Sequence, residues 1–235
     1  LGRTYAHEFA AQGAIPVIAE LNGENGARVV AEIEQKGGRA LSIETDVSRE
    51  TSTLEMAVKT LSAYGRIDCL LNNAAVFSKI TIAPFWELPV DEWNAAMQVN
   101  INGAFFASRA VVPSMMEAKW GRIINIASTT VPTGRANYLH YITSKSAMIG
   151  MTRSMARELG PYNITTHLFW PGAVEAEIER PSASGDMFQK LADQQAIGRP
   201  ATMEEYAAFL LFMCSDDAEY MTGQAIAANG GLAFT

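Results

Sequence analysis

Two kinds of hydrophobic pattern alternate along this chain. Short apolar runs predict buried strands, and longer segments whose apolar residues recur every three to four positions predict helices. We expect strands at 16–21, 40–46, 67–74, 121–128, 163–172 and 224–229. We expect helices at 3–13, 26–37, 50–65, 90–119 (as one helix or two), 140–160 and 203–214, with Gly65 and Gly160 ending two of them.

The order of these elements predicts the fold class. Strands that alternate with helices form a parallel sheet with helices on both faces, and strands covered on both sides read as continuous apolar runs. The 235 residues suit one α/β domain. Residues 175–200 are interpreted as a mobile excursion from that domain. A doubly wound sheet should open with a strand, yet this chain opens with a helix.

Composition narrows the possible partners. The formal net charge of −7 argues against nucleic acid or anionic lipid as the main partner. Cys69 and Cys214 have no short spacing and are interpreted as core residues, and the histidines lack ligand spacing, so we expect no metal. The apolar run 207–214 is too short to cross a bilayer, and no signal peptide precedes the first helix, so we expect a cytoplasmic protein.

Tyr141 and Lys145 form the first candidate for chemistry. On a helix their i, i+4 spacing puts both side chains on one face. An ammonium near a phenol favours the phenolate, and a tyrosine with a lowered pKa can exchange a proton with an alcohol or a carbonyl oxygen. The alternative is coincidence, and the neighbouring Tyr138 has Ile142 rather than a lysine at that offset.

Polar residues at the ends of several predicted strands strengthen the first interpretation. Ser128 ends one strand, Glu20 and Asp46 end two others, and the segment 72–75 ends a fourth. Asn100 is a polar residue inside a long apolar helix. Each has a structural explanation when taken alone, such as a turn-forming serine. Together they indicate a ligand site at the carboxyl ends of parallel strands.

With these motifs the chain resembles the short-chain dehydrogenase/reductase family along nearly its whole length. "NNAA" resembles the family's Asn-Asn-Ala-Gly motif, and "VNINGAF" resembles the segment that carries its catalytic asparagine. "GRIINIAS" and "YITSK" resemble its serine strand and its Tyr-x-x-x-Lys helix. "WPGAVEAEI" resembles the Pro-Gly segment beside the nicotinamide, and residues 198–231 resemble its last helix and strand.

The resemblance implies a doubly wound Rossmann fold and assigns a role to each matching residue. Tyr141 would be the general acid/base, Lys145 would lower its pKa and hold the nicotinamide ribose, Ser128 would position the substrate oxygen, and Asn100 would keep a water near Lys145. Hydride would pass directly between the nicotinamide and the substrate carbon. Besides Tyr141 and Lys145, the implied cofactor-binding residues are Leu1, Gly2, Glu20, Leu21, Asp46, Val47, Asn73, Ala74, Ala75, Pro171, Gly172 and Val174.

Glu20 predicts NAD(H) rather than NADP(H). A carboxylate at the end of this strand would bond the adenosine ribose hydroxyls and repel a 2′-phosphate. The residues that follow, Leu21, Asn22 and Gly23, include no arginine or lysine to compensate. By the same resemblance, small residues in the helices at 94–118 and 139–159 predict pairing between subunits and a homotetramer.

The chain departs from the family's pattern at four places. Its first residues, from Leu1 to Arg3, look like the tail of the family's glycine-rich turn, so the first strand and most of that turn are absent, and we interpret the sequence as a fragment. Ala75 replaces the motif's last glycine. Ala176 stands where many relatives have a threonine that contacts the cofactor. Asn229 replaces an aspartate, and we expect little effect from it.

The substrate is predicted less sharply than the chemistry. We expect the pocket to be apolar and partly aromatic, which favours a bulky or aromatic secondary alcohol and the matching ketone. Two alternatives stay open: a 3-oxoacyl-carrier-protein reductase, and a dinucleotide-binding protein with impaired catalysis. The family members judged most similar are the 1-phenylethanol and pyridoxal dehydrogenases. The expected pocket residues are Thr130, Leu139, Trp170 and Phe188, with Thr129, Val131, Ile178, Met187, Leu191, Phe85 and Trp86 as further candidates.

Overall fold

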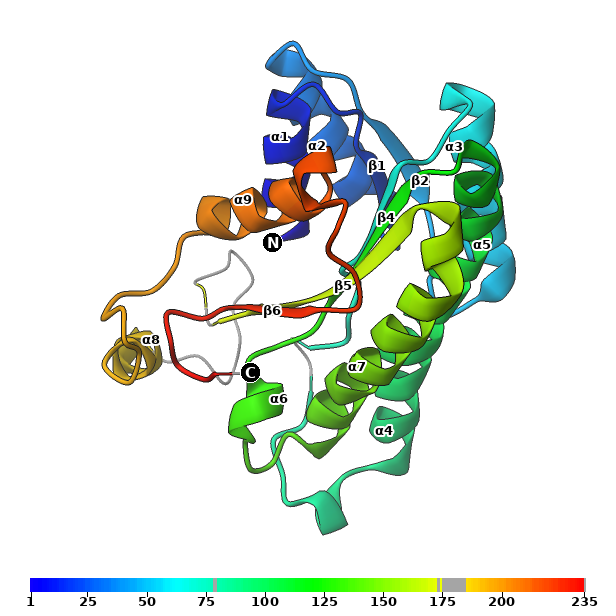
Figure 1. The fold of residues 1–235 in the computed structure, drawn as a ribbon. Coiled ribbons are helices and arrows are strands. Elements are labelled where there is room, and N and C mark those ends of the chain that lie inside the picture. The colour runs from blue at the N-terminus through cyan, green and yellow to red at the C-terminus, as the bar shows by residue number, and fades with distance from the viewer. Residues whose placement is uncertain (78–79, 173, 175–184, 235) are drawn as a thin grey trace.

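A computed structural model describes residues 1–77, 80–172, 174 and 185–234. In these parts the strands are β1 (Val17–Glu20), β2 (Leu41–Glu44), β3 (Cys69–Asn72), β4 (Gly121–Ile126), β5 (Ile164–Pro171) and β6 (Ala225–Ala228). All pairs are parallel. The strands therefore end on the same edge, as the sequence predicts (Figure 1).

The strands form two hydrogen-bonded groups. β1 pairs with β2, and the other group has the order β3-β4-β5-β6. Within the described residues, no strand is hydrogen-bonded between β1 and β3. The interruption between β1 and β3 lies inside the strand array (Figure 1).

Helices cover both faces of the strands, which confirms the predicted fold class (Figure 1). One side carries α1 (Gly2–Ala11), α2 (Gly23–Gln35) and α9 (Met203–Met213), and the other carries α3 (Glu50–Tyr64), α4 (Val90–Met97), α5 (Gly103–Ala118) and α7 (Leu139–Leu159). Short helices α6 (Thr130–Thr133) and α8 (Gly185–Ala192) lie beyond the strand ends. No helix in the described parts is long and apolar enough to cross a membrane.

Strand β4 shows why both faces are apolar. Its neighbouring residues Ile123 and Ile124 are fully buried in different core clusters. Ile124 joins the cluster of α1 and α9, which includes Tyr5 and Leu210. Ile123 joins the cluster of α3 and α5, which includes Met115. Alternation along a strand sends successive side chains to opposite faces, so a strand between two helical layers is apolar throughout.

The structure refines the predicted element boundaries. The segment at 90–119, predicted as one helix or two, consists of α4 and α5 joined by a π-helical turn, Gln98–Asn102. Strand β4 ends at Ile126, so Ser128 lies two residues beyond it. Helix α7 ends at Leu159 with Gly160 as its C-cap, as predicted; Gly160 is right-handed, a 3₁₀ turn follows, and Asn163 is the residue with positive φ. A proline at 161 removes a backbone N–H there, which explains the change of helix type.

A buried chain of amides fixes the helices against the sheet. Asn72 donates to Asn125 Oδ1 (2.8 Å) and to Ser108 Oγ (3.1 Å), while Asn125 donates to Thr152 Oγ1 (2.8 Å). These bonds connect β3 and β4 to α5 and α7. Buried polar groups need such partners, and here the partners set where α7 lies.

Candidate active site

Helix α7 places Tyr141 and Lys145 together at the end of β4. Both side chains are buried, at 7 % and 2 % exposure. The Lys145 ammonium lies 5.9 Å from the centre of the Tyr141 ring and donates a hydrogen bond of 2.7 Å to the Ile126 carbonyl, the last residue of β4. Burial lowers the pKa of the Lys145 ammonium to about 8, because desolvation disfavours the charged form.

Thr130 orients the hydroxyl oxygen of Ser128. The Ser128 hydroxyl oxygen accepts hydrogen bonds from the Thr130 amide (3.2 Å) and from the Thr130 hydroxyl (2.9 Å). A serine hydroxyl has one proton to donate, and these two contacts leave that proton available for another acceptor. The predicted pocket residue Thr130 thus also positions the predicted catalytic serine.

Asn100 lies in the π-helical turn between α4 and α5 and is fully buried. Its Oδ1 accepts from the Val76 amide (2.8 Å), and its Nδ2 donates to Ser144 Oγ (2.9 Å). Ser144 donates in turn to the Tyr141 carbonyl (2.7 Å). Asn100 therefore ties the segment after β3 to the turn of α7 that carries Tyr141. Its role in holding a water near Lys145 stays a prediction.

Glu20 and Glu44 place two carboxylates at neighbouring strand ends. They are paired residues in the β1–β2 register. Glu20 Oε1 accepts from the Asn22 amide (3.1 Å) at the start of α2, and a Cβ placed on Gly23 would lie 3.1 Å from Glu44 Oε2. The exposed Leu21 between them has no charge. This chemistry fits the hydroxyls of an adenosine ribose and opposes a 2′-phosphate.

The amino end of α1 meets the end of β3. A Cβ placed on Gly2 would lie 3.1 Å from Asn73 Nδ2, so only a residue without a side chain fits there without displacing the amide. A helix amino terminus presents free N–H groups to an anion. Together with the buried Lys145 ammonium and the two carboxylates, these residues fit a nicotinamide dinucleotide.

The other predicted cofactor residues have mixed surroundings. Asp46 Oδ1 accepts from the Ser48 amide and hydroxyl, and Gly172 donates to Ala228 O. Leu1 and Val174 pack against the core cluster of α1 and α9. Val47 packs against Gly103, Ala74 and Ala75 are exposed, and Pro171 ends β5. Whether each of them touches the cofactor stays a prediction.

The predicted substrate residues do not form one group. Trp170 is 6 % exposed and packs with Met148 and Leu168 in the core, whereas Leu139 is exposed at the start of α7. Phe188 is half-buried in α8. Ile178 and the side chain of Met187 lie outside the described residues, as does Ala176 of the cofactor segment. Thr130 bonds to the Ser128 hydroxyl, and the Val131 amide donates to the Ser128 carbonyl (3.1 Å).

Phe77 is a residue that the sequence analysis missed. Its ring lies 4.6 Å from the Tyr141 ring, centre to centre, at an interplanar angle of 41°. It follows Val76, which Asn100 holds. The only sequence signal was its position two residues after the "NNAA" segment. Glu44 was also missed, although the strand register could have suggested it.

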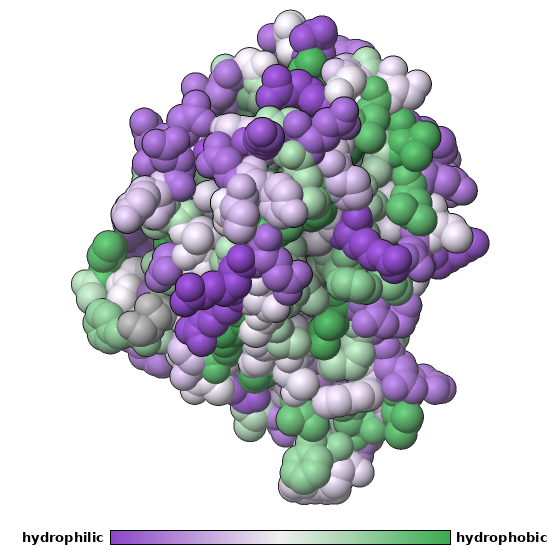
Figure 2. Space-filling view, turned by 45° about the vertical axis from the view of Figure 1, so that its right-hand side comes forward, coloured by the Kyte–Doolittle hydropathy of each residue, from purple (hydrophilic) through white to green (hydrophobic). Residues whose placement is uncertain are grey.

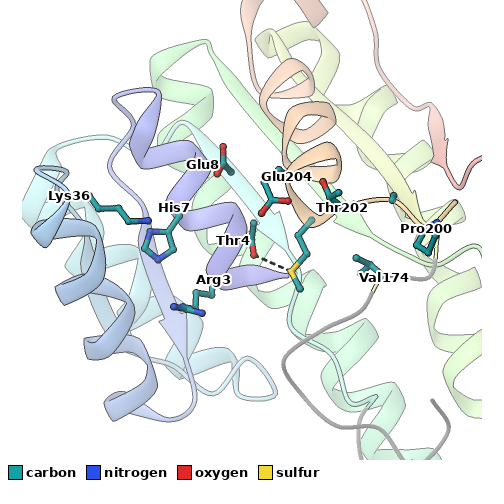
Figure 3. Close-up of a pocket in the computed structure, with 11 residues that line it drawn as sticks. Arg3, Thr4, His7, Glu8, Lys36, Val174, Pro200, Thr202 and Glu204 are labelled. Atoms are coloured by element: carbon teal, nitrogen blue, oxygen red, sulfur yellow. Dashed lines mark hydrogen bonds between the residues drawn. The ribbon is translucent and has the colours of Figure 1, made fainter. Parts of the chain in front are cut away.

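A separate pocket of about 630 Å³ lies between α1 and the start of α9 (Figure 3). Arg3 and His7 line it; Arg3 forms an ion pair with Glu32 of α2, and His7 Nε2 lies 2.9 Å from the same carboxylate. Across the pocket, Thr4 Oγ1 donates to Met203 Sδ (3.1 Å). None of the four predicted catalytic residues lines this pocket.

Comparison with known proteins shows similarity along almost the entire chain. A family model described as enoyl-(acyl carrier protein) reductase matches residues 1–233. The chain is 32 % identical to the 3-oxoacyl-(acyl-carrier-protein) reductase of Aquifex aeolicus, over 99 % of this chain and 92 % of that protein. It is 33 % identical to a (2S)-((R)-hydroxy(phenyl)methyl)succinyl-CoA dehydrogenase subunit of Thauera aromatica, over 98 % and 91 %.

Among solved structures, a short-chain dehydrogenase/reductase from Serratia marcescens superposes with a TM-score of 0.87. It is 31 % identical, and the match covers 98 % of this chain and 92 % of that one. The two curated relatives are named for acyl-carrier-protein and CoA substrates. The finer resemblance to 1-phenylethanol or pyridoxal dehydrogenases therefore stays a prediction.

Proposed function

Because this chain belongs to the short-chain dehydrogenase/reductase family, we propose that it interconverts a 3-oxoacyl thioester and the corresponding 3-hydroxyacyl thioester with NAD(H). The observation that carries this choice of substrate is the similarity, over 99 % of the chain, to a relative named 3-oxoacyl-(acyl-carrier-protein) reductase. This is the alternative that the sequence analysis left open. It replaces a simple aromatic secondary alcohol as the first candidate.

Tyr141, Ser128 and Lys145 have complementary tasks in this proposal. In the reducing direction the Tyr141 phenol donates its proton to the carbonyl oxygen, while the Ser128 hydroxyl donates a hydrogen bond to the same oxygen. Lys145 stabilises the phenolate that forms. In the oxidising direction the phenolate takes the proton of the alcohol. The nicotinamide ring, when bound, supplies or accepts the hydride.

An aromatic substituent on the substrate is the second candidate that an observation favours. The Phe77 ring lies beside the Tyr141 ring. The name of the Thauera aromatica relative places a hydroxyl-bearing carbon next to a phenyl group within an acyl-CoA. An aryl-substituted 3-hydroxyacyl thioester would satisfy both this candidate and the first.

The substrate proposal predicts a preference between two probes. With NADH, kcat/KM for 3-oxobutanoyl-CoA should exceed kcat/KM for acetophenone by about fivefold or more, because one favourable contact to the thioester portion is worth roughly 1 kcal/mol. The loss of NADH absorbance measures both rates. A preference for acetophenone would contradict the thioester proposal and favour a simple aromatic alcohol.

The cofactor proposal predicts that NADH is preferred to NADPH by roughly tenfold or more in kcat/KM, since the carboxylates of Glu20 and Glu44 at the ends of β1 and β2 would repel a 2′-phosphate bound there. Glu20→Ala should reduce this preference, mainly by lowering the rate with NADH. Glu24→Ala is the matched control, because Glu24 lies on the first turn of α2 and is exposed. Faster turnover of NADPH by the unmodified protein would contradict our interpretation of Glu20.

Assembly as a homotetramer stays a prediction. Support comes from the outer side of α5 and α7, where Phe105, Ala147 and Gly150 are exposed. Figure 2 turns this side toward the viewer and shows apolar side chains among the polar ones. Small and apolar residues on a helix face allow close helix pairing between subunits.

A further inference from the structure

The loop after β3 returns across the catalytic tyrosine. Phe77, five residues beyond the end of β3, packs its ring against the Tyr141 ring at 4.6 Å. A tilted arrangement at this distance is within the range of favourable aromatic pairs. A substrate carbonyl that reaches the Tyr141 hydroxyl must therefore carry one substituent close to Phe77.

Hydrogen bonds anchor two described residues near Phe77, Val76 before it and Thr81 after it. On one side Asn100 accepts from the Val76 amide (2.8 Å). On the other side the Glu92 carboxylate accepts two hydrogen bonds from Thr81, from its amide (2.9 Å) and from its hydroxyl (2.6 Å). Asn100 belongs to the predicted catalytic set, whereas nothing so far assigns a role to Glu92.

The surroundings of Glu92 favour the ionised form of its carboxylate. The side-chain hydrogen bond from Thr81, followed by the backbone one, lowers the pKa of Glu92. Glu92 also lies in the first turn of α4, where a helix favours negative charge. Both bonds are therefore charge-assisted at neutral pH, which makes them stronger than bonds between neutral groups.

We propose that Phe77 determines specificity because its ring contacts the substituent on the reacting carbon of the substrate. We propose further that Glu92 is the positioning residue that keeps the Phe77 ring against Tyr141. The inference rests on the function proposed above and adds a substrate class to it: 3-oxoacyl thioesters whose reacting carbon bears a flat, aromatic substituent. An alkyl substituent of similar length binds less favourably against Phe77, because it cannot form an aromatic pair with the ring.

The first experiment compares two substrates on the full chain with NADH. For Phe77→Ala, kcat/KM for 3-oxo-3-phenylpropanoyl-CoA should fall about tenfold, as expected for losing an aromatic contact. For 3-oxobutanoyl-CoA it should fall less than about threefold. Tyr220→Ala is the control, because Tyr220 is an aromatic residue fully exposed on the surface, and it should change neither value.

The second experiment tests the anchor. Glu92→Ala should raise KM for the phenyl substrate by about fivefold while kcat for 3-oxobutanoyl-CoA and the affinity for NADH stay unchanged, and Glu92→Gln should recover part of the loss. Asp91→Ala is the matched control, because Asp91 is the exposed neighbour of Glu92 in the same turn. Should Glu92→Ala fail to fold, Thr81→Ala removes one of the two bonds and should shift the substrate ratio in the same direction.

The outcomes separate this inference from the proposed function. If the unmodified protein reduces neither thioester, the proposed function fails and the inference fails with it. If it reduces both, but the variants of Phe77 and Glu92 lower the two kcat/KM values equally, only the inference is overturned. An Asp91→Ala variant that behaves like Glu92→Ala would also overturn the role of Glu92.

Discussion

Tyr141→Phe should lower kcat about a thousandfold while leaving the fold unchanged and the affinity for NADH within about fivefold, the cost of one lost hydrogen bond. The substitution keeps the ring that packs against Phe77 and removes only the hydroxyl that exchanges the proton. Positioned acid–base groups contribute roughly 10²- to 10⁴-fold to rate, and here no second group is assigned to donate this proton. Steady-state kinetics with 3-oxobutanoyl-CoA and a fluorescence titration with NADH measure the two quantities.

Tyr138→Phe is a matched control for this experiment. Tyr138 is buried just before α7, and within the described residues its hydroxyl has no hydrogen-bond partner. Removing that hydroxyl therefore costs little, and kcat should stay within about twofold of the unmodified value. Undiminished activity in Tyr141→Phe would contradict the role of Tyr141 as the proton donor. Binding of NADH by an unmodified protein that turns over neither substrate would instead support the alternative from the sequence analysis, a dinucleotide-binding protein with impaired catalysis.

The layered fold could be predicted because its causes are local. Continuous apolar runs such as 121–126 can be buried on both sides only in a sheet between helices. The i, i+4 spacing of Tyr141 and Lys145 likewise requires only that the segment be helical, and α7 contains both. The strand ends were predicted less accurately, because the burial pattern continues into the turn that carries Ser128.

The rest of the site depends on contacts that spacing does not reveal. Glu92 bonds to Thr81, eleven positions earlier in the chain, and Asn100 bonds to Ser144, 44 positions later. Trp170 was expected in the pocket because it is aromatic and precedes Pro-Gly. The structure places it in a core cluster with Met148. Alternation along β5 decides which face a residue occupies, and a shift of one position separates core from site.

Lys145→Met should lower kcat/KM roughly a hundredfold and remove a pH dependence that the unmodified protein has. Burial lowers the pKa of the ammonium to about 8, so in the free protein the group is charged below that pH and neutral above it. Both the affinity for NADH and the rate depend on this charge, so both should decline between about pH 7 and about pH 9. Lys59→Met is the control, because Lys59 is exposed on α3.

Loss of folded protein at high pH would not explain this decline in activity, because the contribution of Lys145 to stability changes in the opposite direction. An unfolded lysine has a pKa of about 10.4, so between about pH 8 and that value the folded state binds fewer protons than the unfolded state at this residue. The contribution of Lys145 to stability therefore increases as pH rises through this window. Activity and stability should change in opposite directions in the unmodified protein, and thermal unfolding at each pH tests this. A decline in activity that persists unchanged in Lys145→Met would show that another group is responsible.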